Sequence, residues 1–330
     1  MSLFPFTKYK LRISCNTYNH ASYIEDAMNG FCIQQTDFPF LAIIIDDAST
    51  DGESNVIRKY LDDNFDMSNA RCDENEDAVI IAAVHKDNTN CHFLAVLLKH
   101  NFYSIKKARS PLIKGWYEDV PYVALCEGDD YWTDPIKLQQ QVDFLDSHPD
   151  YSMCFHNAIE HYEDGSKNDR LFSNVENRDY KDVDFLKQWM VPTASVVFHR
   201  EVTGSAIYKH IIFEIKPMFG DTPLFVAASQ IGKVRGMANI MSVYRRQPTG
   251  AVYHNVFDDP QKRDKILNDY YLIAEVIGPH LSDVIIGKYL GYGYEYRQPQ
   301  YFVKCFMKWP LKTIKVAFKG LWTLLKRHVI

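Results

Sequence analysis

Short runs of aliphatic residues alternate with a helical pattern at the start of this chain. Residues 11–15 and 41–45 are apolar and rich in isoleucine, and polar, turn-forming residues follow each run. Between them, residues 22–33 carry apolar side chains at the spacing of one helix face. A strand, a helix and a strand in this order are typical of a parallel sheet covered by helices. The sequence therefore predicts an α/β fold with a mixed, mostly parallel sheet flanked by helices.

The remaining elements are predicted from similar patterns. Further strands are expected over 78–84, 93–98, 152–158 and 194–198, the first two forming a hairpin across 86–90. Helices are expected after a capping box of Thr50 and Glu53, from Asp134-Pro135 to His148-Pro149, and over 222–231. The polar segments 62–77 and 163–180 are expected to be loops, and the chain is expected to be helical from residue 264 onward.

The apolar run 122–126 ends abruptly in three carboxylates within the segment Glu127-Gly128-Asp129-Asp130. Carboxylates this close repel one another unless a cation or a shared proton lies between them. Clustered oxygens suit Mg²⁺ or Mn²⁺, which keep open positions for phosphate oxygens, and Gly128 has no side chain where a ligand approaches. The segment predicts a site for a divalent metal and a diphosphate, and the alternative is a solvated acidic turn.

A second polar group follows the first two predicted strands. Asp46 and Asp47 end one strand, and Asn16 and Tyr18 follow the other. Ligands of open α/β sheets bind in the crevice beyond the carboxyl ends of the strands. These four residues are therefore candidates to clamp a nucleobase, and the alternative is that the two aspartates only cap the next helix.

Several classes of protein are disfavoured by composition. The 330 residues include 37 Lys and Arg against 42 Asp and Glu, a net charge of −5, so nucleic acid is not an expected partner. Seven scattered cysteines without a CxxC spacing argue against a disulfide framework or zinc cluster and favour a cytoplasmic protein. The chain has no glycine-rich phosphate loop, and none of the apolar runs reaches the roughly 18 residues of a membrane span.

Three motifs of this chain resemble those of the family 2 glycosyltransferases of GT-A fold. They are Cys-Asn-Thr-Tyr-Asn at 15–19, Ile-Ile-Ile-Asp-Asp-Ala-Ser-Thr-Asp-Gly at 43–52, and Val-Ala-Leu-Cys-Glu-Gly-Asp-Asp-Tyr-Trp at 123–132. The resemblance covers roughly residues 10–250. It implies a Rossmann-like GT-A catalytic domain over 1–250, followed by a helical extension over 251–330, and a bacterial enzyme of surface polysaccharide synthesis.

The resemblance also implies roles for individual residues. Asp47 matches the aspartate that binds the base of the sugar nucleotide, and Glu127 and Asp129 match the metal-binding DxD motif, with Asp129 as the direct Mn²⁺ or Mg²⁺ ligand. Other residues are expected at the nucleotide-sugar: Asn16, Tyr18, Asp46, Lys106 (or Lys107) and Asp130. For Lys106 and Lys107, the alternative is a solvated surface charge.

By the same resemblance, Asp221 before Thr222-Pro223 is the general base that deprotonates an acceptor hydroxyl. Burial is expected to raise its pKa toward neutrality, which suits a base. Related sequences often carry Tyr-Arg-x-His further on, whereas this chain has Gln247 in the place of the histidine. A histidine ligand to the metal is therefore in doubt, and Arg245 or Arg246 is expected either to bind the diphosphate or to form a salt bridge. His156, His161, His199 and His254 have no metal-binding spacing and are expected to be structural or acceptor-lining.

Together these features predict an inverting, metal-dependent transfer of a sugar from a nucleotide-diphosphate donor, expected to be UDP-linked, to a glycan or lipid-linked acceptor. An inactive sugar-nucleotide-binding or scaffold protein is the alternative. Residues 308–330 alternate lysines with large apolar side chains, typical of a basic helix on an anionic membrane. Packing of that apolar stripe on the catalytic domain is the competing interpretation.

Overall fold

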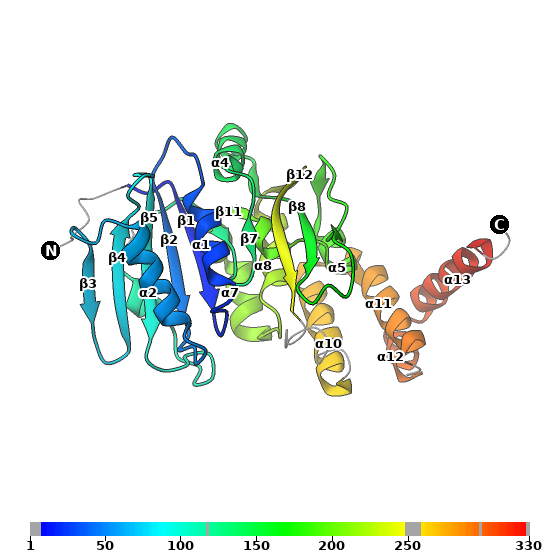
Figure 1. Ribbon diagram of the computed structural model, residues 1–330. Coiled ribbons are helices and arrows are strands. Elements are labelled where there is room, and N and C mark those ends of the chain that lie inside the picture. Colours follow the sequence, from blue (N-terminus) through cyan, green and yellow to red (C-terminus); the bar gives the residue numbers. More distant parts are fainter. Residues whose placement is uncertain (1–7, 117–118, 248–258, 297–298, 328–330) are drawn as a thin grey trace. The chain divides into compact units, whose positions relative to one another are not determined.

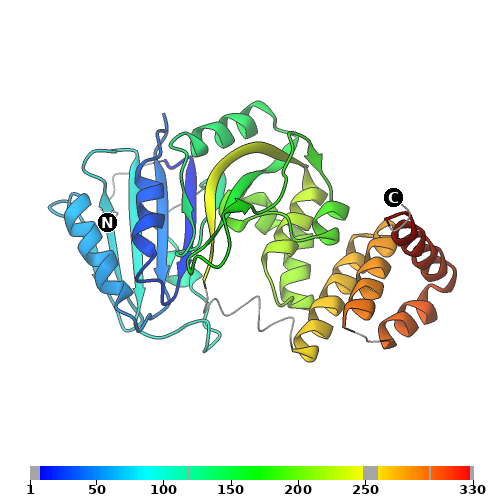
Figure 2. The same cartoon turned by 45° about the vertical axis from the view of Figure 1, so that its right-hand side comes forward.

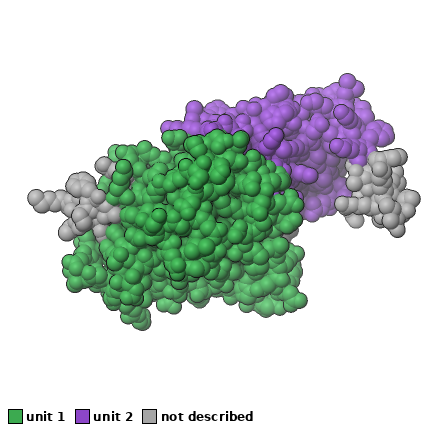
Figure 3. Space-filling view, turned by 90° about the horizontal axis from the view of Figure 1, so that it is seen from above, with its two compact units in different colours: residues 1–179, 190–202, 232–249 green, residues 180–189, 203–231, 250–330 purple. Residues whose placement is uncertain are grey.

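The computed structural model describes residues 8–116, 119–247, 259–296 and 299–327, with side chains to residue 319 (Figure 1). The chain forms two compact units, coloured separately in Figure 3. The first comprises residues 1–179, 190–202 and 232–249, and the second comprises residues 180–189, 203–231 and 250–330. In this division, residues 180–189 and 203–231 group with the C-terminal helices rather than with the rest of the first 250 residues. The assignment of residues 1–250 as the catalytic domain stays a prediction.

The described chain contains a sheet of twelve strands in the order β10-β12-β8-β11-β6-β1-β2-β5-β4-β3, with β7 paired to β12 and β9 to β8. The strands are β1 (Leu11–Thr17), β2 (Phe40–Asp46), β3 (Arg71–Glu74), β4 (Ala78–Val84), β5 (Cys91–Leu98), β6 (Tyr122–Leu125), β7 (Tyr131–Trp132), β8 (Tyr151–Tyr162), β9 (Arg170–Leu171), β10 (Asp179–Tyr180), β11 (Val197–His199) and β12 (Lys233–Arg246).

The centre of the sheet is parallel. β1 pairs in parallel with both β2 and β6, β2 pairs in parallel with β5, and β12 pairs in parallel with β8. β8 also points the same way as β6, because both are antiparallel to β11. The strands that end beside the acidic motifs therefore all finish at one edge, which confirms the predicted mixed, mostly parallel sheet.

Helices cover both faces of this sheet in the first unit. The helical segments are α1 (Ile24–Cys32), α2 (Glu53–Asn64), α3 (Ser110–Ile113), α4 (Lys137–Ser147), η1 (Thr193–Ser195) and α6 (Glu201–Gly204), the last of which runs into the second unit. Figure 2 shows α1 and α2 lying against the strands. Alternate residues of β2 pack under α1, α2 and α4, and the others face a second core beside α3. Every residue of β2 is consequently buried, which is why its sequence is apolar throughout.

Most element predictions are confirmed. The first two strands, the helix between them, the strand over 78–84 and the hairpin to the next strand are present. β8 extends four residues beyond the predicted strand, and β11 starts three residues later because residues 193–195 form a short helix. α4 ends before His148-Pro149 as predicted but starts at Lys137, two residues after Pro135.

Three predictions are wrong. Residues 62–77 are not a loop throughout, because α2 continues to Asn64 and 71–74 form the edge strand β3. Residues 163–180 contain the short strands β9 and β10. Thr50 and Glu53 do not form a capping box: Gly52 precedes α2 in a left-handed conformation, and the Glu53 side chain turns into the protein instead.

Apart from Tyr180 of β10, the regular elements described in the second unit are helices, as predicted from residue 264 onward. Its elements are α5 (Asp182–Lys187), α7 (Ala206–His210), η2 (Ile211–Ile215), α8 (Asp221–Ile231), α10 (Pro260–Ile277), η3 (Pro279–Leu281), α11 (Ser282–Glu295), α12 (Gln300–Lys308) and α13 (Pro310–Arg327). Pro310 divides the predicted amphipathic segment, so Lys308 closes α12 and α13 begins after it. Within the described residues, each helix is too short or too polar to cross a bilayer.

Candidate functional site

The carboxyl ends of β1, β2 and β6 bring three sequence motifs together. The amide of Asp47 donates a hydrogen bond to the Thr17 carbonyl at 3.0 Å, and the amide of Gly128 donates to the Asn16 carbonyl at 3.1 Å. The segment after β1 therefore lies between the other two. Residues more than 100 positions apart become neighbours because the three strands are parallel and adjacent in the sheet.

Asp47 anchors a loop beyond β5 and pairs with a cation. Its carboxylate accepts hydrogen bonds from the amides of Phe102 at 2.7 Å and Tyr103 at 3.1 Å, and from the Arg109 guanidinium at 2.7 Å. Arg109 also donates to the side-chain oxygen of Asn16 at 2.9 Å. Among the described residues, Oδ1 of Asp47 receives only the Phe102 bond, so it retains capacity to accept one more donor. Asp47, Asn16 and Arg109 thus form a polar cluster at the sheet edge.

Asp46 lies in a different environment from Asp47. It is fully buried, and its carboxylate accepts hydrogen bonds from the Ser49 amide and the Ser54 hydroxyl. These contacts shape the loop before α2, but neither aspartate caps that helix, whose N-cap residue is Gly52 without a side-chain cap hydrogen bond. Tyr18, in contrast, is 45% exposed and leaves its ring available to a ligand. Contacts of Asp46 or Tyr18 with a nucleotide remain predictions.

The cation that meets this cluster is Arg109 rather than Lys106 or Lys107. Lys106 is exposed, and the ammonium group of Lys107 pairs with Asp77 at 2.5 Å. Arg109 was missed because no spacing in the sequence distinguishes it from the lysines before it. Its role depends on the fold of the 99–109 loop around Asp47.

The acidic segment after β6 is held against β1. A Cβ atom on Gly128 would lie 2.1 Å from the Thr17 hydroxyl oxygen and 2.6 Å from its Cβ, so only glycine fits. This contact, rather than the approach of a ligand, explains the glycine. Glu127 is exposed beyond it, and Asp129 is partly exposed. Packing against Thr17 places Asp129 beside the loop that follows β1.

Asp130 turns inward. Its side chain is 1% exposed, and Oδ1 accepts a hydrogen bond from the Arg245 amide at 2.9 Å, while Oδ2 is buried without a partner among the described residues. Burial, followed by the nearby charges of Asp129 and Glu127, raises the pKa of this carboxyl well above its usual range. A donor contact by Asp130 stays a prediction, and the burial of the side chain argues against it.

The residues at the end of β12 contact the acidic segment. The Gln247 amide nitrogen donates to Oδ2 of Asp129 at 2.9 Å, so glutamine does occupy a position beside the candidate metal ligand. Arg245 is 8% exposed, pairs with Asp26 and lies over the rings of Tyr23 and Tyr131. Arg246 pairs with Glu160 at 2.6 Å. Of the two expectations for these arginines, the structure favours the salt bridges.

A histidine that the sequence analysis missed also lies at Asp129. Nε2 of His20 is 3.7 Å from Oδ2 of Asp129, and its Nδ1 is 3.2 Å from the Thr17 hydroxyl. Glu53 accepts hydrogen bonds from that hydroxyl and from the His20 amide at 2.9 Å. The available signal was position, since His20 directly follows the motif at the end of the first strand.

A divalent cation fits beside Asp129. Carboxylate oxygens and imidazole nitrogens both bind such ions, and Nε2 of His20 faces the carboxylate without a donor between them. In the part of the chain that the structure describes, no group of three or more His, Cys, Asp or Glu side chains is arranged to hold a metal alone. The protein would therefore supply one or two ligands, with a diphosphate and water completing the coordination, as is usual for Mg²⁺ sites.

Asp221 belongs to the second unit and is the first residue of α8. Its Oδ2 accepts a hydrogen bond from the Trp189 indole at 3.0 Å and its Oδ1 accepts one from the Thr222 amide at 2.7 Å. Burial raises its pKa above the ordinary 3.8, and these two hydrogen bonds oppose part of that rise. The direction agrees with the expectation for a base, while its catalytic role stays a prediction.

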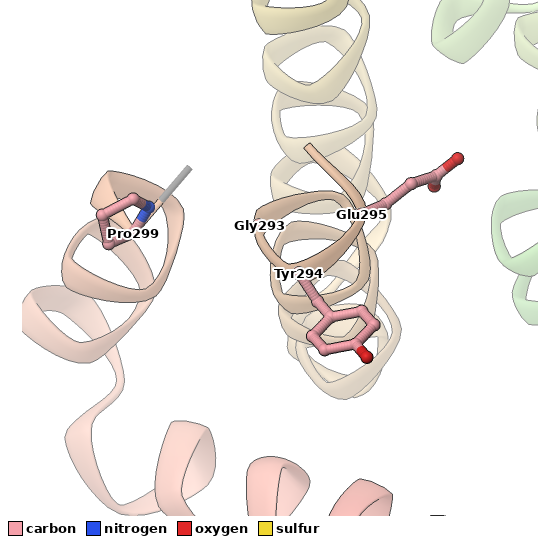
Figure 4. A pocket seen from close by; sticks show the side chains of 4 residues that line it. All are labelled: Gly293, Tyr294, Glu295 and Pro299. Carbon is pink, nitrogen blue, oxygen red and sulfur yellow. The ribbon is translucent and has the colours of Figure 1, made fainter. Parts of the chain in front are cut away.

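The other histidines form no further site among the described residues. His156 is fully buried, His161 lies 2.8 Å from Asp169, and His199 packs against the Tyr122 ring. His254 lies outside the described residues. A hollow of about 620 Å³ adjoins Gly293, Tyr294, Glu295 and Pro299, but in Figure 4 their side chains do not converge, and none is a predicted site residue.

Comparison with known sequences identifies relatives without an assigned activity. The uncharacterized proteins Mb1547 of Mycobacterium bovis and Rv1520 of Mycobacterium tuberculosis are each 33% identical to this chain over 246 residues, which is 74% of this chain. The chain spans only 61% of the length of these relatives. No family model matches the chain.

Comparison with solved structures identifies the fold. Staphylococcus aureus TarS 1–349 in complex with UDP-GlcNAc matches with a TM-score of 0.55 and 14% identity, covering 93% of this chain and 79% of that chain. Mannosyltransferase PcManGT from Pyrobaculum calidifontis, in complex with GDP-Man and Mn²⁺, matches with a TM-score of 0.50 and 13% identity, covering 97% and 82%. At this identity the likeness concerns architecture. The chain has a GT-A-type fold, with a mixed, mostly parallel sheet, flanking helices and additional C-terminal helices.

Proposed function

We propose that this protein is a metal-dependent glycosyltransferase of family 2 that uses a nucleotide-diphosphate sugar. The observation that carries the proposal is the convergence of two polar clusters at one sheet edge. Asp47, Asn16 and Arg109 form one, and Asp129, His20 and Gln247 form the other. A nucleoside diphosphate needs both a site for its base and a site for its charged phosphates, and the two clusters supply them.

The donor is proposed to be UDP-linked. Oδ1 of Asp47 can accept the imide N–H of a uracil ring, and the exposed ring of Tyr18 offers a stacking face. The solved neighbours support a nucleotide-sugar in general, since one has UDP-GlcNAc bound and the other GDP-Man with Mn²⁺. The two polar clusters do not indicate which sugar is transferred or which acceptor receives it. A glycan or lipid-linked acceptor of surface polysaccharide synthesis is proposed from the family resemblance.

For the chemical step, Asp221 is proposed as the general base. It would take the proton of an acceptor hydroxyl, whose oxygen attacks the anomeric carbon opposite the diphosphate. Displacement from the opposite face inverts the configuration at that carbon. Mn²⁺ or Mg²⁺, when bound at Asp129, would neutralise charge that develops on the departing diphosphate. An inactive sugar-nucleotide-binding protein remains the second candidate.

The donor site is tested by calorimetric titration with UDP in the presence of Mn²⁺. Wild type is expected to bind UDP, and Asp47→Asn is expected to weaken binding by about tenfold or more, because a desolvated hydrogen-bond partner is worth on the order of 1.5 kcal/mol. Asp77→Asn, which alters the partly buried partner of Lys107, is the matched control and should bind as wild type does. Equal binding by Asp47→Asn, or none by wild type, contradicts the proposed donor site.

The C-terminal helices are proposed to contact an anionic membrane surface. On α13, Leu311, Ile314 and Phe318 form a stripe and are 83%, 40% and 68% exposed, while Thr313 on the opposite side is buried. α12 adds exposed apolar residues that the sequence analysis did not include: Phe302, Val303, Phe306 and Met307. These exposed residues of α12 and α13, called the apolar patch below, keep 40% to 83% of their surface uncovered by the described protein, which disfavours the competing interpretation.

Charge indicates what covers this apolar patch. At 100° per residue, Lys312, Lys315 and Lys319 lie along one flank of the α13 stripe, and Lys315 and Lys319 are exposed. Anionic lipids attract such lysines by about 1 kcal/mol each, while apolar side chains enter the interface. Leu321, Trp322, Leu325 and Lys326 belong to the same predicted face, but their side chains lie outside the described part.

Vesicle sedimentation measures this contact. The double variant Leu311→Ser/Phe318→Ser is expected to bind vesicles of mixed phosphatidylglycerol and phosphatidylcholine at least about tenfold more weakly than wild type, since each side chain loses roughly 1.5 kcal/mol or more of burial. Phe213→Ser, which alters an exposed residue outside the apolar patch, is the control. Binding that is unchanged in the double variant, or that is equal on purely zwitterionic vesicles, contradicts the proposal.

A further inference from the structure

We infer that His20 is a direct nitrogen ligand of the divalent cation held at Asp129. The inference deepens the proposed metal-dependent transfer and rests on it. It starts from Nε2 of His20 and Oδ2 of Asp129, which lie 3.7 Å apart with their side chains 20% and 27% exposed. The residue comes from the loop after β1, not from the end of β12, where Gln247 stands.

The contacts behind His20 determine which of its nitrogens carries a proton. Thr17 has one hydroxyl proton, and it donates this proton to Oε1 of Glu53. The Thr17 oxygen can then only accept at Nδ1 of His20, so Nδ1 carries the hydrogen. In the neutral imidazole, Nε2 is consequently the nitrogen with the lone pair. This nitrogen is the one that lies 3.7 Å from Oδ2 of Asp129.

A cation between these two acceptors is favourable, because each of them can give it a lone pair. A carboxylate oxygen and an imidazole lone pair cannot hydrogen-bond to each other. Two ligands of one divalent cation lie closer together than these two atoms, so a side-chain movement of under about 1 Å would let both groups hold the same ion. Gln247 donates to the same Oδ2 at 2.9 Å and so helps to orient the carboxylate.

Buried groups hold this arrangement. Glu53 is fully buried, and its Oε2 accepts hydrogen bonds from the His20 amide at 2.9 Å and the Ser49 hydroxyl at 2.8 Å. A histidine that ligates a metal usually donates its other ring N–H to an oxygen that is itself fixed. The chain Glu53, Thr17, His20 has this form. It also explains why Glu53 leaves the predicted capping box.

A nitrogen ligand favours one metal over another. Carboxylate and water suit Mg²⁺, whereas an imidazole adds affinity for transition metals such as Mn²⁺. His20 therefore makes the site selective for Mn²⁺. In His20→Gln, Mn²⁺ affinity is expected to fall at least about tenfold, as lost metal-site contacts typically cause, with a smaller change for Mg²⁺.

Pulsed electron paramagnetic resonance of Mn²⁺ bound together with UDP tests the ligand directly. Wild type is expected to show nitrogen-14 coupling from a bound imidazole, and His20→Gln is expected to lose it. His148→Gln, which alters an exposed histidine at the end of α4, should keep it. The wild-type spectrum alone shows whether an imidazole is bound to Mn²⁺, so this test does not depend on how well a variant folds.

The possible results separate this inference from the proposed function. Bound Mn²⁺ without imidazole coupling in wild type overturns His20 as a ligand and leaves the metal-dependent transfer in place. Coupling that persists in His20→Gln likewise overturns it. If wild type binds no Mn²⁺ with either UDP or GDP, both the ligand and the metal dependence are wrong.

Discussion

Replacement of Asp221 by asparagine is expected to lower kcat for sugar transfer by about 10²- to 10⁴-fold, the usual contribution of a general base. The side chain keeps its shape but cannot take a proton. Donor binding should change little, because Asp221 belongs to the second unit and the nucleotide clusters belong to the first. The measurement is single-turnover transfer from UDP-sugar, together with a UDP titration of the same variant.

The pH dependence of sugar transfer tests the same role of Asp221. Burial raises the pKa of Asp221 above 3.8, and the base acts only when ionised, so transfer should fall as pH drops through that raised pKa. Trp189 donates to the carboxylate and favours its ionised form. Trp189→Phe is therefore expected to move the acidic limb to higher pH and to leave the rate well above it nearly unchanged.

Two outcomes would rule out this role for Asp221. One is near-normal transfer by a folded Asp221→Asn protein. The other is an acidic limb that stays in place in Trp189→Phe, since a limb caused by another group does not respond to this hydrogen bond. A rate loss confined to Asp221→Asn, with the shifted limb in Trp189→Phe, fits only a proton acceptor at position 221.

Removal of the divalent metal is expected to have the second large effect. Stabilisation of the leaving diphosphate by a cation is worth several kcal/mol, so chelation with EDTA should lower transfer by roughly 10³-fold or more. Added Mn²⁺ should restore wild type. In Asp129→Ala it should restore little, because the carboxylate beside His20 and Gln247 is gone.

The matched control for Asp129 is Asp143→Asn. This aspartate lies on the exposed side of α4 and accepts a hydrogen bond from Gln139, away from the sheet edge. It should behave as wild type before and after chelation. Full transfer in EDTA, or full rescue of Asp129→Ala by Mn²⁺, would remove both the metal and Asp129 from the mechanism.

Much of the fold was predictable because its signals are local. The run 40–46 is buried on both faces. Its unbroken apolar sequence predicts this burial without reference to any other segment of the chain. Acidic residues at the ends of two such runs likewise indicated the edge of the sheet where a ligand binds. The errors fell on segments with weak local patterns, such as the edge strand 71–74, whose alternate residues are exposed.

The partners of the site residues were not predictable in the same way. Lys106 and Arg109 are both cations in one loop, and only the path of that loop around Asp47 brings Arg109 to the cluster. Asp129 and Asp130 are adjacent carboxylates, yet one is exposed enough to bind a ligand and the other is buried under the Arg245 amide. Neighbouring residues of one type thus acquire different roles through contacts far away in the sequence.

The sequence by itself determined the alternating strands and helices and the acidic ends of the strands, because periodicity and charge are properties of short segments. Only the tertiary structure decided that Glu53 fixes Thr17 and His20, that His20 faces Asp129 and that Arg109 joins Asn16 to Asp47. The physical reason is that each of these contacts joins different loops, from His20 and Glu53, which are 33 positions apart, to His20 and Asp129, which are 109 positions apart. The order and register of the parallel strands determine which loops become neighbours, and this information is not contained in any short stretch of sequence.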